Sequence, residues 1–312
     1  MGGWTSAVQG EDIGGARWFL DCVLIQTLTR WAVPCFIMIS GFLLLDDGKE
    51  IGIEKTVRYV VRMAGALLAF GLPYCLIETV VEEGFADIPH IVAVSFRNLL
   101  EGRSWTHIWY VYMMLGLYLM LPLFRAFAKT ADDKTYRFVL AVLFCMTIVR
   151  PAVNGIFGIA VEILIPVNTA YPFYFLMGYY LGKHKIKKSY LMAGLVLGTI
   201  GMITGQIFGA DNSPGNLLVA VYSVAIFALA ADSRFLEKCS ENRIISQISK
   251  YSFGIYLIHP FFLNVMNKAL HIYPTSFPIA AGEVLFFAVA IAGAYLSAWI
   301  LCRIRIMRKI LL

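Results

Sequence analysis

The sequence predicts an all-α protein, a polytopic helical bundle that crosses a membrane about nine times. The first observation is composition: 59% of the 312 residues are hydrophobic and 15% are charged, against about 45–50% and about 25% in soluble domains. The second is that apolar windows close to the length of a membrane span, roughly 20 residues, recur along the whole chain. The third is that Lys and Arg gather in alternate connections.

Nine apolar windows are candidate spans within one predicted transmembrane domain, residues 18–312. The first window is the least regular, because only its second half, from Val33, is continuously apolar. The windows lie at about residues 22–45, 59–80, 107–124, 138–156, 168–182, 190–209, 216–232, 251–272 and 279–302.

The basic residues of the connections predict the orientation. Five alternate connections carry four Lys or Arg residues each, twenty of the 26 in the chain. Because such residues are retained on the cytoplasmic side, we expect a multi-pass protein of the bacterial cytoplasmic (inner) membrane with a cytoplasmic C-terminus. The net charge of +6 comes from these connections. It suits anionic lipid headgroups, so the lipid bilayer is an expected partner and nucleic acid is not.

Residues 1–17 are polar and glycine-rich, without the basic and apolar segments of a signal peptide. Nine spans and a cytoplasmic C-terminus would place this segment outside the cell. We therefore interpret it as the remnant of an external loop, and we expect a tenth helix upstream of Met1.

The sequence predicts neither a metal site nor a bound cofactor. The six cysteines are scattered without a CxxC pair, and cysteines of this kind usually pack as small apolar residues. The chain contains no GxGxxG, Walker or HExxH motif.

Two groups of basic residues are candidates for function. Arg30 precedes the apolar run that begins at Val33, and a cation at the edge of a span is costly unless it is paired. Arg58 and Arg62 follow Lys55 and are four residues apart, so they share one helix face. Their guanidinium groups would suit the phosphates of a nucleotide or coenzyme, although ordinary cytoplasmic anchoring explains them as well.

Two histidines lie at or in predicted spans. His107, Trp109 and Tyr110 open the third window from the external side. Histidine can transfer protons near neutral pH and the aromatic rings could form a stacking floor, or all three could belong to an interfacial aromatic belt. His259 stands directly before Pro260 and must find a polar partner at that depth, which could be a purely structural hydrogen bond.

A polar external loop is the last candidate. It carries Arg150 and Glu162, together with Asn154 and Asn168. Such a loop could meet an extracytoplasmic substrate, or it could simply be solvated.

Taken together, five segments in order resemble the membrane acyltransferase 3 family. They are VPCFIMISGFLLL after Arg30, then KTVRYVVR, HIWYVYMMLGLYLMLPLF, YPFYFLMGYYLG and YSFGIYLIHP. Their spacing is most similar to the O-acetyltransferase branch, which includes polysaccharide-adhesin modifiers and the membrane half of vancomycin-resistance serine racemases.

The resemblance implies a ten-helix bundle that transfers an acyl group, usually acetyl, from cytoplasmic acyl-CoA. The acceptor would be a hydroxyl of an extracytoplasmic envelope glycan or a lipid-linked sugar, and acetyl-CoA would be a substrate rather than a bound cofactor. The resemblance places Lys55, Arg58 and Arg62 at the acyl-CoA entrance. It makes Arg30 and His107 candidate catalytic residues. The candidate substrate-binding residues are Trp109, Tyr110, Arg150, Glu162 and His259.

One departure from the family pattern keeps two other interpretations open. Relatives are expected to carry their catalytic base, a histidine, in a first helix that this sequence lacks, so His107 would have to replace it. General-base assistance is worth about 10²–10⁴-fold in rate, so the chain could be an inactive truncated homologue. It could also be a transporter or exporter of a sugar or amino acid, which would use intramembrane Arg and His without needing the Arg58 and Arg62 face.

Overall fold

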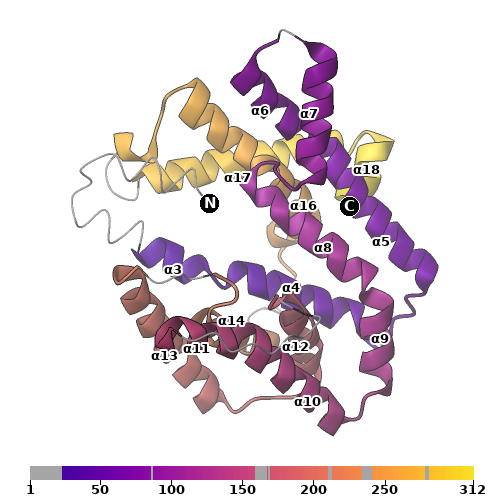
Figure 1. Ribbon diagram of the computed structural model, residues 1–312, viewed down its shortest axis with the longest axis vertical. Coiled ribbons are helices and arrows are strands. Elements are labelled where there is room, and N and C mark those ends of the chain that lie inside the picture. Colours follow the sequence, from indigo (N-terminus) through magenta and orange to yellow (C-terminus); the bar gives the residue numbers. More distant parts are fainter. Residues whose placement is uncertain are drawn as a thin grey trace. The chain divides into compact units, whose positions relative to one another are not determined.

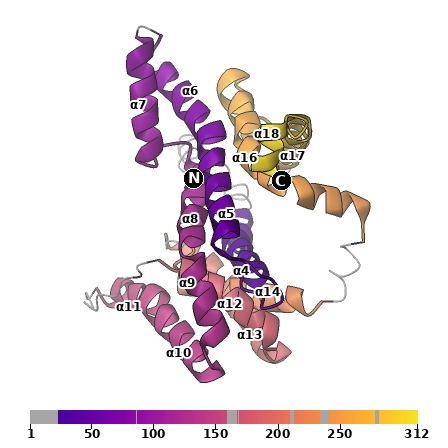
Figure 2. The same cartoon turned by 90° about the vertical axis from the view of Figure 1, so that its right-hand side faces the viewer.

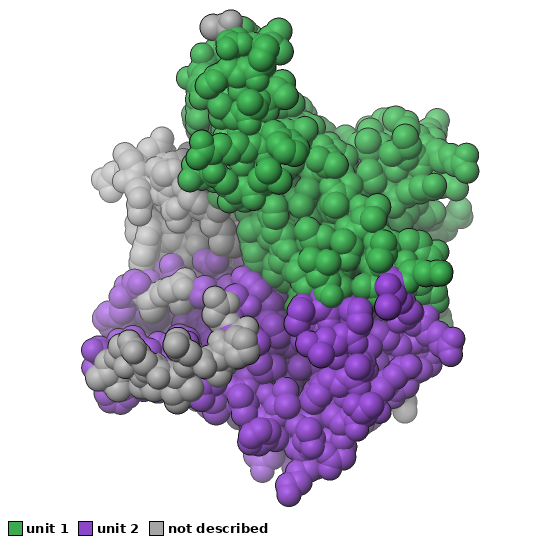
Figure 3. Space-filling model, turned by 45° about the vertical axis from the view of Figure 1, so that its right-hand side comes forward, with its two compact units in different colours: residues 1–11, 54–119, 238–312 green, residues 12–53, 120–237 purple. Residues whose placement is uncertain are grey.

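The computed structural model describes residues 23–85, 87–158, 167, 169–209, 213–233, 241–277 and 281–312. Within those ranges every regular element is a helix, which confirms the predicted all-α class. The chain divides into two compact units, coloured separately in Figure 3. Unit 1 comprises residues 1–11, 54–119 and 238–312, and unit 2 comprises residues 12–53 and 120–237. The predicted external segment 1–17 lies outside the described residues.

Five helical stretches of the described chain are long and apolar enough to cross a membrane. A sixth candidate is a pair of helices, Thr106–Leu119 and Leu121–Thr130, which bend by 52° at their junction. The five stretches are Val23–Leu44, Ile53–Glu83, Asp133–Phe157, Lys188–Ile207 and Ala281–Leu301. These six therefore match six of the nine predicted windows.

The other three windows coincide with helices that do not meet the same standard. Helices α12 (Tyr171–Lys183) and α14 (Leu217–Ala231) have 13 and 15 residues, fewer than the roughly 20 that cross a bilayer. Helix α16 (Arg243–Asn264) is long enough, but its first two turns, RIISQISK, are half polar. The predicted helices are present, and the count of nine spans is not confirmed.

The described part of unit 1 starts with a long helix that forms a hairpin with the helix after it. Helices α5 (Ile53–Ala66) and α6 (Leu72–Glu83) are joined by the π-helical turn η2 (Leu67–Gly71). Gly84, whose φ of 80° favours glycine, ends α6, and helix α7 (Ile88–Leu100) then packs beside it (Figures 1 and 2).

Helix α7 is absent from the predicted windows because its 13 residues are too few to cross a membrane. Asp87 caps it by accepting a hydrogen bond from the backbone N–H of His90. A buried hydrogen bond of 3.1 Å from Ser95 Oγ to Thr79 Oγ1 joins it to α6. The segment between the second and third predicted windows therefore contains a helix that forms a hairpin with α6.

The rest of unit 1 comes from two later parts of the chain. The short 3-10 turn η3 (Thr106–Ile108) leads into α8 (Trp109–Leu119). Helix α16 packs along α17 (Ala281–Leu301), and a methyl group added at Gly254 would lie only 2.7 Å from Ala298 Cβ. The remaining elements of unit 1 are η5 (Val265–Ala269), η6 (Pro274–Ser276) and α18 (Arg305–Leu311).

Unit 2 is organised around α4 (Ala32–Leu44), which packs against α12. A Cβ at Gly41 would lie 1.8 Å from the backbone oxygen of Phe175, and one at Gly178 would lie 2.0 Å from that of Met38. The two backbones touch at both glycines, a mode of packing that membrane helices use because small residues let them approach closely. The other elements of unit 2 are α3 (Gln26–Thr29), α9 (Leu121–Thr130), α10 (Asp133–Phe144), η4 (Cys145–Val149), α11 (Arg150–Phe157) and α13 (Lys188–Ile207).

Candidate active site

Unit 1 brings His107 and His259 together from opposite parts of the sequence. His107 lies in η3, and His259 lies in the second half of α16. Their ring centroids are 5.8 Å apart and the ring planes are inclined at 65°. Both side chains are half-buried, so the pair is shielded from bulk solvent while remaining within reach of a substrate.

The backbone carbonyl of Leu257 on α16 ties the pair to a third element. It accepts a hydrogen bond of 2.8 Å from the hydroxyl of Tyr74 on α6, and His107 Nε2 lies 3.2 Å from the same oxygen. The hydroxyl of Tyr256 donates in turn to the backbone carbonyl of His107. Hydrogen bonds around His107 and the Leu257 carbonyl therefore join the turn η3 to the helices α6 and α16.

Pro260 explains how His259 is held. Proline has no N–H, so the carbonyl of Tyr256, four residues earlier, loses its normal partner in the helix. His259 Nδ1 lies 2.9 Å from that carbonyl oxygen and 3.1 Å from that of Ile255. The imidazole therefore supplies the hydrogen that the proline cannot, and its ring is fixed against its own helix.

These contacts assign the proton positions of both neutral rings. A carbonyl oxygen only accepts hydrogen bonds, so the ring nitrogen that faces it must carry the hydrogen. In His107 this nitrogen is Nε2, which leaves the lone pair on Nδ1. In His259 it is Nδ1, which leaves the lone pair on Nε2. The pair thus offers two proton-accepting nitrogens, one from each ring.

Aromatic side chains surround the two histidines. Tyr74 stacks on Trp105 with centroids 4.0 Å apart and also meets His107 edge-on at 5.6 Å. On the other side, Tyr110 meets Tyr256 at 5.3 Å. Rings of this kind form a flat apolar surface on which the face of a sugar or acyl group can lie. Trp109 is 38% exposed and contacts Tyr110 at 6.2 Å, so it belongs to the margin of the cluster.

Sequence reasoning found the two histidines together with Trp109 and Tyr110, but not Tyr74 or Trp105. Tyr74 and Trp105 carry no local signal beyond lying near the predicted spans. Within the part of the chain that the structure describes, no three His, Cys, Asp or Glu side chains gather into a group that could hold a metal ion. The chemistry available at this cluster is proton transfer and stacking.

The basic residues on one face of α5 differ in how far they are exposed. Lys55 and Arg58 are exposed. Arg62 is half-buried, and its Nε and Nη2 donate to the carbonyls of Ile310 and Leu311 at 2.8 and 3.1 Å. Two of its donors therefore stabilise the C-terminal end of α18, whereas the guanidinium of Arg58 is exposed.

Two candidate basic residues belong to unit 2, whereas both histidines belong to unit 1. Arg30 is half-buried where α3 ends and α4 begins, and Arg150 is half-buried at the first position of α11. Glu162 lies outside the described residues.

Arg125 of α9 is a buried arginine that the sequence gave no reason to single out from other cytoplasmic basic residues. Its side chain is 5% exposed, and its guanidinium donates to the backbone carbonyls of Leu44, Asp46 and Lys49. It therefore holds the connection that follows α4.

The same connection is held from α12. Lys183 Nζ lies 2.5 Å from Asp47 Oδ2, and the hydroxyl of Tyr179 lies 3.0 Å from both Asp47 carboxylate oxygens. The hydrogen bond from Lys183 lowers the pKa of Asp47 below its usual value of 3.8, because it stabilises the charged form.

Comparison with known proteins assigns the family. A model of the acyltransferase domain family Acyl_transf_3 matches residues 5–303. The chain belongs to this family. A Bacillus subtilis (strain 168) protein described as "Putative membrane-bound acyltransferase YfiQ" is 24% identical over 304 residues, covering 88% of this acyltransferase and 80% of the relative. No solved structure matches the chain. The family predicted from the five sequence segments is therefore confirmed, while the O-acetyltransferase branch stays a prediction.

Proposed function

We propose that this membrane acyltransferase moves an acyl group, usually acetyl, from acyl-CoA on the cytoplasmic side to a hydroxyl of an extracytoplasmic envelope glycan or lipid-linked sugar. The observation that carries the proposal is the histidine pair, which offers two proton-accepting nitrogens inside an aromatic cluster. Acetyl transfer to a hydroxyl needs a proton acceptor and a surface for the sugar. Transport of a neutral solute needs neither a base nor a coenzyme site.

In the proposed step, the acceptor hydroxyl donates its proton to Nδ1 of His107. The hydroxyl oxygen attacks the thioester carbonyl, the new C–O ester bond forms and the C–S bond breaks. The departing CoA thiolate takes the proton from His107, so atoms and charge balance. Nε2 of His107 stays hydrogen-bonded to the Leu257 carbonyl, which keeps the ring oriented throughout.

His259 would bind the substrate rather than move the proton. Its Nε2 can accept a hydrogen bond from a second hydroxyl of a sugar, while Nδ1 remains bound to the Tyr256 carbonyl. Tyr110, Trp109 and the Tyr74–Trp105 stack would contact the faces of the sugar and acyl groups.

The donor would be recognised by the exposed start of α5. Lys55 and Arg58 present positive charge there, and guanidinium and ammonium groups bind phosphates well. CoA carries its phosphates on the nucleotide part, so this face would bind the coenzyme without contacting the reacting carbonyl.

The hydroxyl of Ser40 is poorly placed to carry a covalent acyl intermediate. Its side chain is half-buried and donates to the carbonyl of Phe36 in its own helix at 2.9 Å. Direct transfer from thioester to acceptor is therefore the simpler mechanism.

The decisive experiment compares His107→Gln with His90→Gln in purified protein, following release of the CoA thiol from acetyl-CoA. Glutamine can still donate to the Leu257 carbonyl but cannot act as a base. We expect His107→Gln to lower the rate by about 10²–10⁴-fold. His90 is an exposed histidine of α7 that pairs with Glu83, so its replacement should leave the rate unchanged. Equal rates in the two variants would refute the role of His107.

The donor site is tested separately by thermal stability. A ligand present at 100 times its dissociation constant raises the free energy of unfolding by about 2.7 kcal/mol. Acetyl-CoA should therefore raise the melting temperature of the purified protein. Arg58→Gln should reduce that rise. No rise at millimolar acetyl-CoA, in a protein that binds an uncharged sugar, would favour the transporter interpretation.

A further inference from the structure

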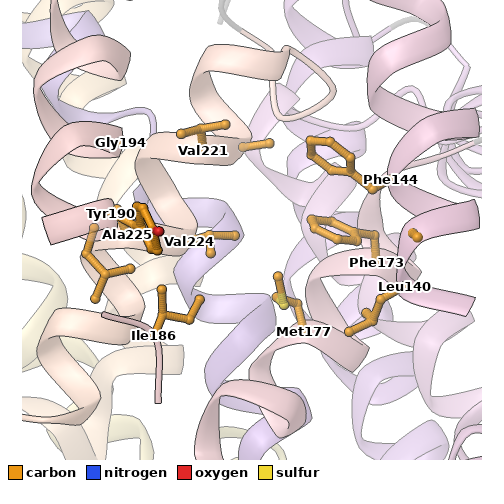
Figure 4. A pocket seen from close by; sticks show the side chains of 13 residues that line it. Leu140, Phe144, Phe173, Met177, Ile186, Tyr190, Gly194, Val221, Val224 and Ala225 are labelled. Atoms are coloured by element: carbon orange, nitrogen blue, oxygen red, sulfur yellow. The ribbon is translucent and has the colours of Figure 1, made fainter. Parts of the chain in front are cut away.

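Unit 2 contains an apolar cavity that the proposed reaction does not use. It has a volume of about 380 Å³ and lies between α10 and α12 on one side and α13 and α14 on the other (Figure 4). Leu140, Phe144, Phe173 and Met177 form one wall. Val221, Val224 and Ala225 of α14 contribute to the opposite wall.

Small residues let α13 and α14 approach each other beside the cavity. Gly194 of α13 lines the cavity, as do Ala220 and Ala225 of α14. One turn further along α13, Gly198 lets that helix approach Tyr222, where an added methyl group would lie 2.8 Å from Tyr222 Cβ. At Gly194 itself an added methyl group would lie 3.2 Å from Val221 Cγ1, so the two helices are in close contact at both glycines and bound the cavity on one side.

An unfilled gap of this kind is unfavourable, because the side chains that line it lose their contacts on one side. Its volume lies near the lower end of the range for small-molecule sites, about 300–1,000 Å³. It can therefore hold a segment of a single hydrocarbon chain. In a protein that lies in a bilayer, the hydrocarbon chains available to fill the cavity are the acyl chains of lipids.

Three lysines are next in sequence to residues that line the cavity. Ile186, Tyr190 and Leu191 line it, and the sequence around them is Lys185-Ile186-Lys187-Lys188. Lys185 and Lys188 both face Asp232, at 2.5 and 3.9 Å. The side chains of all three lysines are exposed. The single carboxylate of Asp232 does not neutralise three ammonium groups, so positive charge remains next to Ile186, one of the lining residues.

We propose that this cavity binds one acyl chain of an anionic phospholipid whose phosphate lies against Lys185, Lys187 and Lys188. The apolar wall selects a hydrocarbon chain, and the adjoining positive charge selects an anionic headgroup. The predicted cytoplasmic position of the lysines agrees with this choice, because anionic lipids are enriched in that leaflet and attract basic segments. The site lies wholly within unit 2 and does not depend on the acyl-transfer proposal.

The test uses the purified full chain in nanodiscs of phosphatidylcholine containing one part in ten of phosphatidylglycerol, followed by detergent extraction and native mass spectrometry. Wild-type protein should retain one phosphatidylglycerol molecule. Val224→Trp should fill the cavity and lower the retained fraction at least tenfold. Val196→Trp, on a side chain of α13 that is 52% exposed, is the matched control and should retain the lipid as the wild type does.

A second variant does not disturb the packing. Lys187→Gln/Lys188→Gln changes exposed side chains only, and it should abolish the preference for phosphatidylglycerol over phosphatidylcholine. Equal retention in Val224→Trp and Val196→Trp, or an unchanged preference in the lysine variant, would overturn the proposal. Retention of palmitoyl-CoA in place of phospholipid, lost in Val224→Trp, would overturn it in favour of a site for the donor's acyl chain.

Discussion

Replacing Gly41 by alanine should separate α4 from α12. The added methyl group would lie 1.8 Å from the backbone oxygen of Phe175 and 2.7 Å from its carbonyl carbon, whereas real Cβ contacts essentially never fall below 3.0 Å. The obstacle is backbone, so a rotamer change cannot relieve it. The helices must move apart by more than about 1 Å at a contact flanked by the buried side chains of Ile37, Met38 and Leu176.

The cost follows from that displacement. Overpacking a well-packed interior typically costs about 1–3 kcal/mol, and a contact that displaces a whole helix belongs at the upper end of this range. At about 2–4 °C per kcal/mol for chains of 150–250 residues, the melting temperature should fall by roughly 6–12 °C. The assay is thermal unfolding of purified Gly41→Ala in a fixed detergent, followed by loss of the monodisperse peak in size-exclusion chromatography.

Gly116→Ala is the matched control. Gly116 lies in α8 with nothing within 4 Å of a Cβ placed on it. Alanine at this position should stabilise the helix by about 0.8–1.0 kcal/mol, because its helix propensity is higher than that of glycine. Gly178→Ala, on the facing helix, should resemble Gly41→Ala. The double variant should cost less than the sum of the two, because residues in contact couple. A melting temperature for Gly41→Ala equal to that of Gly116→Ala would refute the close packing of α4 and α12.

Three further predictions concern the loop after α4 and the histidine cluster. Arg125→Met should release the loop by leaving its carbonyls without their charged donor. Because hydrogen bonds to charged groups contribute about 1.5–3 kcal/mol each, limited proteolysis should cut after Lys49 faster than in the wild type. The lowered pKa of Asp47 predicts stability that is present above pH 3.8 and is lost as the pH falls further, through the pKa of the folded state. Asp47→Asn should remove this part of the acid dependence in thermal scans. Tyr74→Phe keeps the stack on Trp105 but loses the hydrogen bond to the Leu257 carbonyl. The free energy of unfolding should fall by about 0.5–1.5 kcal/mol. A melting temperature equal to that of the wild type would contradict this prediction.

The sequence predicted the helices better than it predicted their contacts. Hydropathy located the helices because burial in lipid acts on each residue separately. It missed α7, because an apolar helix of 13 residues is shorter than a membrane span. His107 and His259 were each recognisable as polar groups at the level of a span. Their pairing depends on α16 meeting η3 across 150 residues, which no local pattern encodes.

The role of Arg62 shows the same limit. Four-residue spacing predicted a phosphate-binding face with Arg58, and that spacing is correct for a helix. The partners of Arg62 are main-chain carbonyls nearly 250 residues later, and every residue type has such carbonyls, so composition cannot reveal them. Arg125 was counted with the cytoplasmic basic residues for the same reason.

Pro260 determines which ring nitrogen of His259 carries a hydrogen, because it leaves the main-chain carbonyl of Tyr256 without its usual N–H partner. At any other residue type, position 260 would carry an amide hydrogen directed at the Tyr256 carbonyl, and the imidazole of His259 could exchange its two tautomers. With proline there, the hydrogen on Nδ1 is needed to satisfy that carbonyl, and Nε2 is left basic. A residue with no titratable group thus decides which atom of its neighbour can receive a hydrogen bond.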